Sequence, residues 1–177
     1  MIMPVERTGV VTMGGNPRTL VGPEVKAGDK APNFTVLANN FSPVTLESSQ
    51  GKIRLISVVP SLDTGVCSAQ TKRFNDEAGK LPENVEVLTV SADLPFAQRR
   101  FCGAENIDKI KVLSDHKEMS FGEAYGVMIK EMRILTRAVF VVDQNDTVRY
   151  AEYVPEVTTH PNYDAVLDAV KKLAGKS

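Results

Sequence analysis

Two cysteines, Cys67 and Cys102, are the residues of this chain best suited to do chemistry. In a reducing compartment, a disulfide between two thiols is more often transient and catalytic than structural. Cys67 closes the segment PSLDTGVC at residues 60–67, directly after a β-branched apolar run. A structural role stays open at this point, because buried free cysteines are common as small hydrophobic residues.

The elements around Cys67 are predicted to be a buried strand followed by a helix. Residues 53–59 read IRLISVV, which is typical of a central strand, and Pro60 ends it. Thr64 can cap the helix that follows, in which the apolar residues Phe74, Ala78 and Leu81 recur at helical spacing up to Pro82. Cys67 then lies in the first helical turn, where free backbone amides and the helix dipole stabilise a thiolate.

Thr64 and Pro60 are further candidates for the same site. Thr64 lies three residues before the sulfur and can point its hydroxyl into a shared pocket. Pro60 has no amide proton and can shield the sulfur from water. Threonines also cap helices and prolines also end strands without any part in chemistry, so the spacing alone leaves both interpretations open.

Four segments together resemble a known family. The pattern Pro-x-x-x-Thr-x-x-Cys after a buried strand is similar to the peroxidatic signature of the peroxiredoxins, and PSLDTGVC resembles their atypical two-cysteine branch, the bacterial thiol peroxidases. The resolving-cysteine segment, the arginine-bearing strand and the amino-terminal hairpin of that branch are matched by SADLPFAQRRFCGAEN at 91–106, TRAVFVVD at 136–143 and GNPRTLVG at 15–22. These segments occur in order over most of the chain.

The resemblance implies a role for each site residue and a reaction. Cys67 would be the peroxidatic cysteine and Cys102 the resolving one, while Thr64 and Pro60 line the pocket and Arg137 reaches it from its strand. The implied activity is the reduction of hydrogen peroxide and organic hydroperoxides to water and alcohols in antioxidant defence. Cys67 would become a sulfenic acid, and Cys102 would convert it to an intramolecular disulfide. From composition alone, Arg137 would instead be expected on the surface.

The same resemblance implies protein partners. Thioredoxin would reduce the disulfide, and the protein would be a homodimer with active sites near the interface. The sequence offers only apolar residues such as Phe96, Phe121 and Tyr125 as contacts, and such residues are more often core. The implied chemistry needs no metal or other cofactor.

Resolution places a demand on the structure. A disulfide between Cys67 and Cys102 closes a loop of about 35 residues and requires α-carbons within about 7 Å. Because the cysteines are predicted on different helices, we expect the helix at 95–102 and the first turn around Cys67 to unwind locally during each cycle.

The remaining pattern predicts the fold class. Residues 9–22 read as a hairpin, and strands are predicted at 34–37, 44–46, 85–90, 111–113, 138–142 and 147–154, with helices at 95–102 and 119–125. A carboxy-terminal helix presents Tyr163, Val166, Leu167, Val170 and Leu173 on one face. We predict an α/β, thioredoxin-like fold with a central mixed sheet flanked by helices. Residues 1–177 are expected to form a single domain, with residues 1–27 as an amino-terminal hairpin extension.

Charge and hydropathy argue against some classes of binding partner. The formal net charge is -1, which does not favour a nucleic acid or a charged membrane surface. The amino terminus has no basic segment followed by an apolar stretch, and no run approaches the length of about 18 apolar residues that a membrane span needs. A cytoplasmic location is expected.

Other functions could use the same residues. Cys67, Cys102, His116 and His160 have the atoms of a zinc site, but their spacing matches no local chelating pattern. A peroxide sensor or redox relay to partner proteins, or a holdase, could use the cysteines without turnover. A thioredoxin-type reductase is disfavoured because Ser68, Ala69 and Gln70 follow Cys67, so a Cys-x-x-Cys pair is absent.

Overall fold

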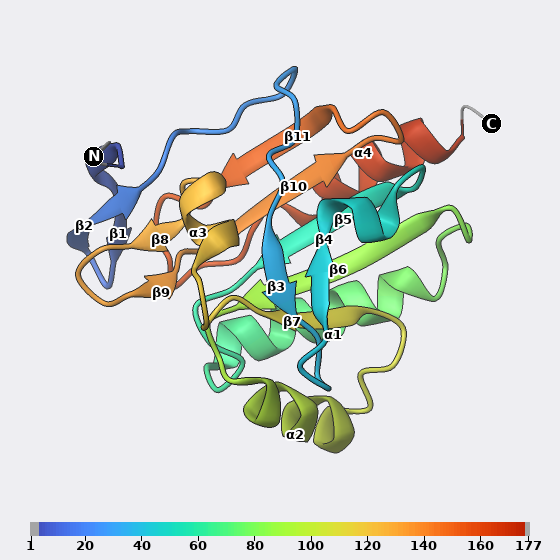
Figure 1. Cartoon of the computed structure of the whole chain (residues 1–177), viewed down its shortest axis with the longest axis horizontal. Coiled ribbons are helices and arrows are strands. Elements are labelled where there is room, and N and C mark those ends of the chain that lie inside the picture. The colour runs from blue at the N-terminus through green and yellow to red at the C-terminus, as the bar shows by residue number, and fades with distance from the viewer. Residues whose placement is uncertain (1–3, 176–177) are drawn as a thin grey trace.

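A seven-stranded mixed sheet forms the centre of the computed structural model, which describes residues 4–175 (Figure 1). The strand order is β11-β10-β5-β6-β7-β3-β4. The strands are β3 (Thr35–Leu37), β4 (Pro43–Thr45), β5 (Ile53–Val58), β6 (Val85–Ser91), β7 (Lys111–Ser114), β10 (Ala138–Val142) and β11 (Val148–Tyr153). Strands β5, β6 and β7 are parallel, whereas β10 runs antiparallel to β5. The predicted mixed α/β architecture is confirmed.

Strand β5 lies in the middle of the sheet because its sequence can be buried on both faces. All six of its residues are buried. Ile53 and Leu55 contribute to one apolar cluster, and Ile56 and Val58 contribute to the cluster on the other face. This alternation is the period of two of a strand. The strand ends directly before the segment that carries Pro60 and Cys67, so a rigid central element supports the site.

Helices cover both faces of the sheet, as predicted. On one face, α1 (Gly65–Ala78) and α4 (Tyr163–Ala174) pack on the cluster that contains Ile53 and Leu55. On the other face, α3 (Ser120–Ala124) packs against β3 and is followed by Tyr125, whose ring stacks on that of Phe121. The fourth helix, α2 (Pro95–Glu105), packs against β7 and carries Cys102.

The predicted amino-terminal hairpin belongs to a second, smaller sheet of order β1-β2-β8-β9. Its strands are β1 (Glu6–Met13), β2 (Asn16–Val21), β8 (Met128–Ile129) and β9 (Ile134–Leu135). The turn at Gly14 and Gly15 has φ angles of 59° and 82°. A two-residue turn with positive φ at both positions joins twisted strands well, and glycine adopts it without steric cost. Strands β8 and β9 were not predicted, since two residues carry no periodic signal.

Two helices differ from the sequence prediction by three residues at their carboxy-terminal ends. Helix α1 ends at Ala78, so Leu81 packs on the apolar cluster from the turn that follows rather than from the helix. Helix α2 continues past the predicted residue 102 to Glu105 and ends where Asn106 adopts a left-handed conformation with φ of 56°. Asparagine tolerates this conformation and therefore ends the helix. A short 3₁₀ helix, η1 (Leu46–Ser49), was also not predicted.

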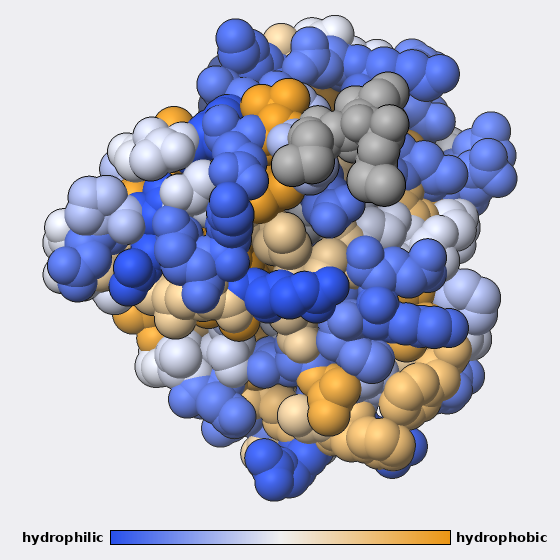
Figure 2. Space-filling view, turned by 60° about the vertical axis from the view of Figure 1, so that its left-hand side comes forward, coloured by the Kyte–Doolittle hydropathy of each residue, from blue (hydrophilic) through white to orange (hydrophobic). Residues whose placement is uncertain are grey.

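The face of the molecule drawn in Figure 2 is largely polar. Figure 2 shows a mainly hydrophilic face with apolar side chains in several separate areas. Of the three aromatic residues considered as interface contacts, Phe121 and Tyr125 are completely buried, whereas Phe96 is 60% exposed and lies against Phe41 with ring centroids 5.0 Å apart. No helix within residues 4–175 is long and apolar enough to cross a membrane.

Candidate active site

Cys67 is the third residue of α1, and its side chain is fully buried. The predicted position in the first helical turn is therefore confirmed. Thr64 is the N-cap residue by backbone geometry, and its carbonyl accepts the amide proton of Ser68 at 2.9 Å. The sequence predicted that its hydroxyl caps the helix, but the hydroxyl instead donates to the Ser61 carbonyl at 3.0 Å. The first-turn amides of α1 therefore receive no bond from the Thr64 hydroxyl.

Arg137 contacts the sulfur of Cys67 from the segment between β9 and β10. It lies between β9 and β10, is 2% exposed, and donates from Nη2 to Cys67 Sγ at 3.2 Å. Its Nη1 donates to Gln70 Oε1 at 2.9 Å and its Nε to the Val157 carbonyl at 2.7 Å. The composition-based expectation of a solvated arginine is therefore wrong. A guanidinium at this distance stabilises negative charge on the sulfur, because burial weakens screening by water.

Gln70 is a site residue that the sequence interpretation missed. It is completely buried, and its Nε2 donates to Ser57 Oγ at 2.7 Å while its Oε1 accepts from Arg137. The amide thus fixes one arm of the guanidinium and is itself fixed by β5. The available signal was spacing, because a residue three positions after Cys67 lies on the same helix face.

A cavity of about 160 Å³ borders this constellation. Pro60, Thr64 and Arg137 are among its lining residues. The remaining lining residues are Met13, Gly65, Val66, Val157 and Thr158. Most of these are apolar, and they come from three separate parts of the chain: the tip of the β1–β2 hairpin, the start of α1 and the segment after β11. Arg137 and Thr64 are therefore polar residues in the lining of a mainly apolar pocket.

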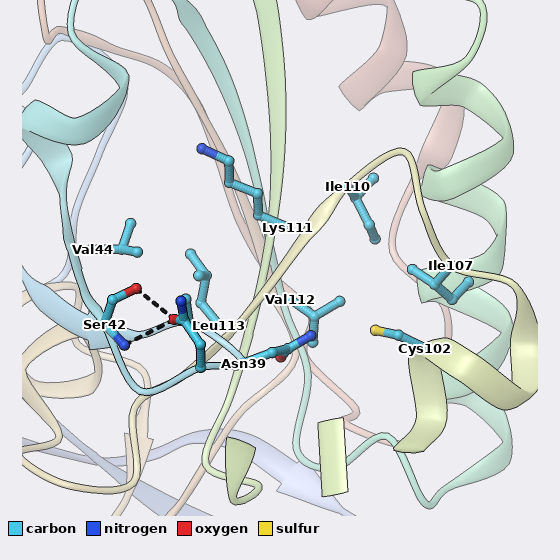
Figure 3. A pocket seen from close by; sticks show the side chains of 11 residues that line it. Asn39, Ser42, Val44, Cys102, Ile107, Ile110, Lys111, Val112 and Leu113 are labelled. Atoms are coloured by element: carbon cyan, nitrogen blue, oxygen red, sulfur yellow. Dashed lines mark hydrogen bonds between the residues drawn. The ribbon is translucent and has the colours of Figure 1, made fainter. Parts of the chain in front are cut away.

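Cys102 lines a different and larger cavity of about 470 Å³. In Figure 3 its sulfur points into this cavity, with Ile107 and Val112 beside it and Asn39 across from it. Burial raises the pKa of the Cys102 thiol, and a hydrogen bond from the Asn39 side chain opposes this shift only in part. At neutral pH the group is therefore mainly a thiol.

Both cysteines are free thiols, and one apolar cluster connects them. Cys67 belongs to its buried members together with Ile107 and Val112, and Cys102 packs against it from the partly buried side. Cys67, Cys102, His116 and His160 do not gather into a cluster that could hold a metal ion in the described part of the chain. The arrangement provides a buried nucleophile, a cation in contact with it, and a second thiol on a neighbouring helix.

Comparisons with known proteins agree on one family. Residues 26–167 match the Redoxin family. The thiol peroxidase of Halalkalibacterium halodurans is 63% identical over 161 residues, which cover 91% of this chain and 96% of that protein. The thiol peroxidase of Bacillus subtilis is 60% identical over 163 residues, with coverage of 92% and 97%. The crystal structure of a peroxiredoxin-like protein from Aquifex aeolicus superposes with a TM-score of 0.87 at 43% identity, covering 97% of this chain and 99% of the other.

Proposed function

Because this chain belongs to the Redoxin family and, within it, to the thiol peroxidases, we propose that it reduces hydrogen peroxide and organic hydroperoxides through Cys67 and Cys102. The family assignment makes the protein a peroxidase that consumes a peroxide and a thiol reductant and has a thioredoxin-like fold. The observation that carries the proposal is the 3.2 Å contact between Arg137 Nη2 and the buried sulfur of Cys67.

In the first step, the Cys67 thiolate attacks one oxygen of the hydroperoxide. The O–O bond breaks, a bond from sulfur to oxygen forms, and the other oxygen takes up a proton and leaves as water or alcohol. Cys67 becomes a sulfenic acid. Negative charge moves from sulfur to the leaving oxygen, so a donor that contacts both ends of this path stabilises the transition state. Arg137 contacts the sulfur and lines the cavity, which gives it that position.

An acidic thiol alone would not account for peroxidase activity. Lowering the pKa of a thiol raises its thiolate fraction but lowers its nucleophilicity, with a Brønsted coefficient of about 0.4 to 0.5. Enzymes commonly accelerate reactions by about a million-fold or more, which corresponds to about 8 kcal/mol. Most of this must come from donors that are already oriented toward the O–O bond. Gln70 and the Val157 carbonyl hold the Arg137 guanidinium in one orientation and so contribute to this preorganisation.

In the second step, Cys102 attacks the sulfenic sulfur, water leaves, and a disulfide forms. The two cysteines lie on α1 and α2, and a disulfide requires their α-carbons to come within about 7 Å. We propose that α2 and the first turn of α1 unwind locally to allow this. The exposed residues Gly103 to Asn106 at the end of α2 support the proposal, because a solvated helix end opens at low free-energy cost.

The rate of this second step should rise with pH. The pKa of the Cys102 thiol is raised by burial, so the thiolate that attacks becomes more abundant as the solution becomes more alkaline. Disulfide formation after one equivalent of peroxide can be followed by acid quench and mass spectrometry between about pH 6 and pH 9. A rate independent of pH over this range would mean that unwinding, rather than thiolate attack, limits resolution.

We further propose that thioredoxin reduces the disulfide, that the protein is a cytoplasmic homodimer, and that the whole chain forms one domain. Thioredoxin-type dithiols exchange with exposed disulfides, and a half-buried Cys102 on a surface helix is open to such attack. Of the three aromatic residues that the sequence offered as dimer contacts, Phe96 lies on the surface, where its ring packs against that of Phe41.

The proposal is tested by turnover of three proteins, namely wild type, Cys67→Ser and Cys102→Ser. Each is given hydrogen peroxide or cumene hydroperoxide together with thioredoxin, thioredoxin reductase and a nicotinamide donor. We expect Cys67→Ser to be inactive and Cys102→Ser to consume about one equivalent of peroxide and then stop. Normal turnover of Cys102→Ser would show that resolution does not use Cys102.

A further inference from the structure

Glu156 lies at the point where the amino-terminal hairpin meets the peroxide cavity. It follows β11 and forms an isolated parallel bridge with Thr12 of β1. The Thr12 amide donates to the Pro155 carbonyl, and the Val157 amide donates to the Thr12 carbonyl, both at 2.8 Å. The hairpin is therefore joined by backbone hydrogen bonds to the segment that contributes Val157 and Thr158 to the lining of the cavity.

The Glu156 carboxylate fastens the tip of this hairpin. Its Oε1 accepts from Thr12 Oγ1 and from the Gly15 amide, both at 2.8 Å, and its Oε2 accepts from the Gly14 amide at 3.1 Å. Thr158 donates to Oε2 from its amide at 2.9 Å and from its hydroxyl at 2.6 Å. These bonds hold the pKa of Glu156 well below its usual range, and those from Thr158 have the largest effect. The carboxylate therefore stays charged.

Met13 is the residue that this arrangement places in the cavity. It lies between Thr12 and Gly14, which both donate to Glu156, and it lines the cavity together with Val157 and Thr158. A water molecule occupies about 30 Å³ of liquid volume, so a cavity of about 160 Å³ has more room than hydrogen peroxide needs. The Met13 wall is therefore placed to contact the organic group of a larger hydroperoxide.

We propose that Glu156 is a positioning residue that holds Met13 against the cavity and thereby sets the preference for organic hydroperoxides over hydrogen peroxide. The proposal rests on the proposed function, because it refines the substrate choice of the same site. Glu156 acts through Met13 and does not contact Cys67. Its loss should change how well an organic group binds, and it should leave the sulfur, Arg137 and Gln70 in place.

The test compares two peroxides in matched variants. Glu156→Gln keeps the size of the side chain but removes its charge and one of its acceptor oxygens. We expect KM for cumene hydroperoxide to rise by about tenfold with little change in kcat, and kcat/KM for hydrogen peroxide to change by less than about twofold. Glu131→Gln is the control, because Glu131 also binds the hairpin, at the Thr19 amide, but away from the cavity. It should leave both substrates unchanged.

A double-mutant cycle separates positioning from a general loss of structure. Met13→Ala should raise KM for cumene hydroperoxide as Glu156→Gln does, and the double variant should be no worse than either single one, because the two residues act as one unit. Equal losses with both peroxides, or effects of the two substitutions that simply add, would overturn the proposal.

Hydrogen exchange tests the hairpin independently of activity. In Glu156→Gln the amides of Gly14 and Gly15 should exchange about tenfold faster than in wild type, whereas Glu131→Gln should not affect them. Unchanged exchange would contradict the role of Glu156 even if the protein proved to have no peroxidase activity. An inactive wild type with accelerated exchange in the variant would instead contradict the proposed function and the substrate preference built on it.

Discussion

Two buried arginines stand at opposite ends of the same pair of strands, and their partners differ in kind. Arg54 lies near the start of β5 opposite Val142, at the end of β10, whereas Arg137 directly precedes β10 at its other end. Both are almost completely inaccessible, with exposed fractions of 0% and 2%. Burying a charge is costly unless it is paired and hydrogen-bonded, so each needs a reason to be there.

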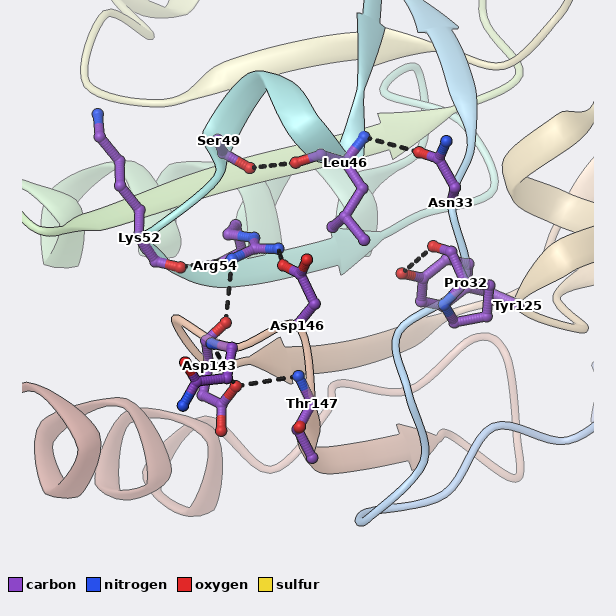
Figure 4. A network of polar contacts seen from close by, with 11 residues as sticks. Pro32, Asn33, Leu46, Ser49, Lys52, Arg54, Tyr125, Asp143, Asp146 and Thr147 are labelled. Atoms are coloured by element: carbon purple, nitrogen blue, oxygen red, sulfur yellow. Dashed lines mark hydrogen bonds and ion pairs between the residues drawn. The ribbon is translucent and has the colours of Figure 1, made fainter.

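Arg54 is neutralised by a carboxylate. Its Nη2 pairs with Asp146, and its Nη1 donates to the carbonyls of Lys52 at 2.6 Å and Asp143 at 3.0 Å (Figure 4). Asp143 in turn accepts from the amides of Asn145 and Thr147, both at 2.9 Å. The arginine thereby fixes the turn between β10 and β11 against the start of β5.

Within residues 4–175, Arg137 has hydrogen-bond acceptors but forms no ion pair with a carboxylate. Its three donors end on a backbone carbonyl, a carboxamide oxygen and the sulfur of Cys67. Its positive charge therefore remains available to stabilise a thiolate and a polar substrate in the adjoining cavity. The comparison teaches that burial of an arginine does not indicate its role, whereas the chemistry of its acceptors does.

The largest expected effect comes from Arg137→Lys. Lysine keeps the positive charge but cannot reach Cys67, Gln70 and the Val157 carbonyl at once, because it has a single donor atom. We expect kcat/KM for hydrogen peroxide to fall by about 100-fold to 1000-fold, as when an oriented donor is removed from an active site. Circular dichroism would verify that the variant is folded. Peroxidase rates equal to those of wild type would break the comparison, since the forked geometry would then be unnecessary.

The same substitution at the other arginine is the matched control and gives the next largest effect. In Arg54→Lys, one ammonium group cannot serve Asp146 and both carbonyls, so a buried acceptor loses its partner. We expect the free energy of unfolding, measured with urea, to fall by about 2 kcal/mol. The kcat/KM of the folded protein should stay within about twofold of wild type. A loss of activity without a loss of stability would show that both arginines serve the chemistry.

The local parts of the site could be predicted from the sequence. An apolar run, a proline and helical spacing are short-range signals, and they placed Cys67 correctly in the first turn of α1. The hairpin was equally predictable, because glycines between two apolar runs are a short-range turn signal in the sequence. Both glycines of the turn have positive φ in the structure. Only the resemblance to peroxiredoxins pointed to Arg137, because its contact with Cys67 spans 70 positions and leaves no periodic trace.

The parts that were missed depend on tertiary contacts. Met13 lines the cavity, and Glu156 binds the hairpin tip beside it from a segment more than 140 positions away. Nothing in either local sequence indicates this contact. Arg54 interrupts an apolar strand, and the sequence does not show that Asp146, in a turn on the neighbouring strand pair, neutralises it. Side chains that close long-range contacts between exposed turns and buried strands are therefore the least predictable.

The smallest effect is expected from Asp146→Asn, a substitution that leaves Arg54, like Arg137, without a carboxylate partner. Asp146→Asn replaces the carboxylate by a neutral carboxamide, so Arg54 would be left with neutral acceptors only. Asp146 has φ of 60°, a conformation that asparagine also tolerates, so the turn itself should persist. The Asp146 side chain is 33% exposed, and water therefore compensates part of the lost attraction. We expect unfolding in urea to become easier by about 1 kcal/mol, with peroxidase activity unchanged. A loss of several kcal/mol would show that a buried arginine in this sheet requires a charged partner, and the uncompensated charge of Arg137 would then have to be sustained by the thiolate itself.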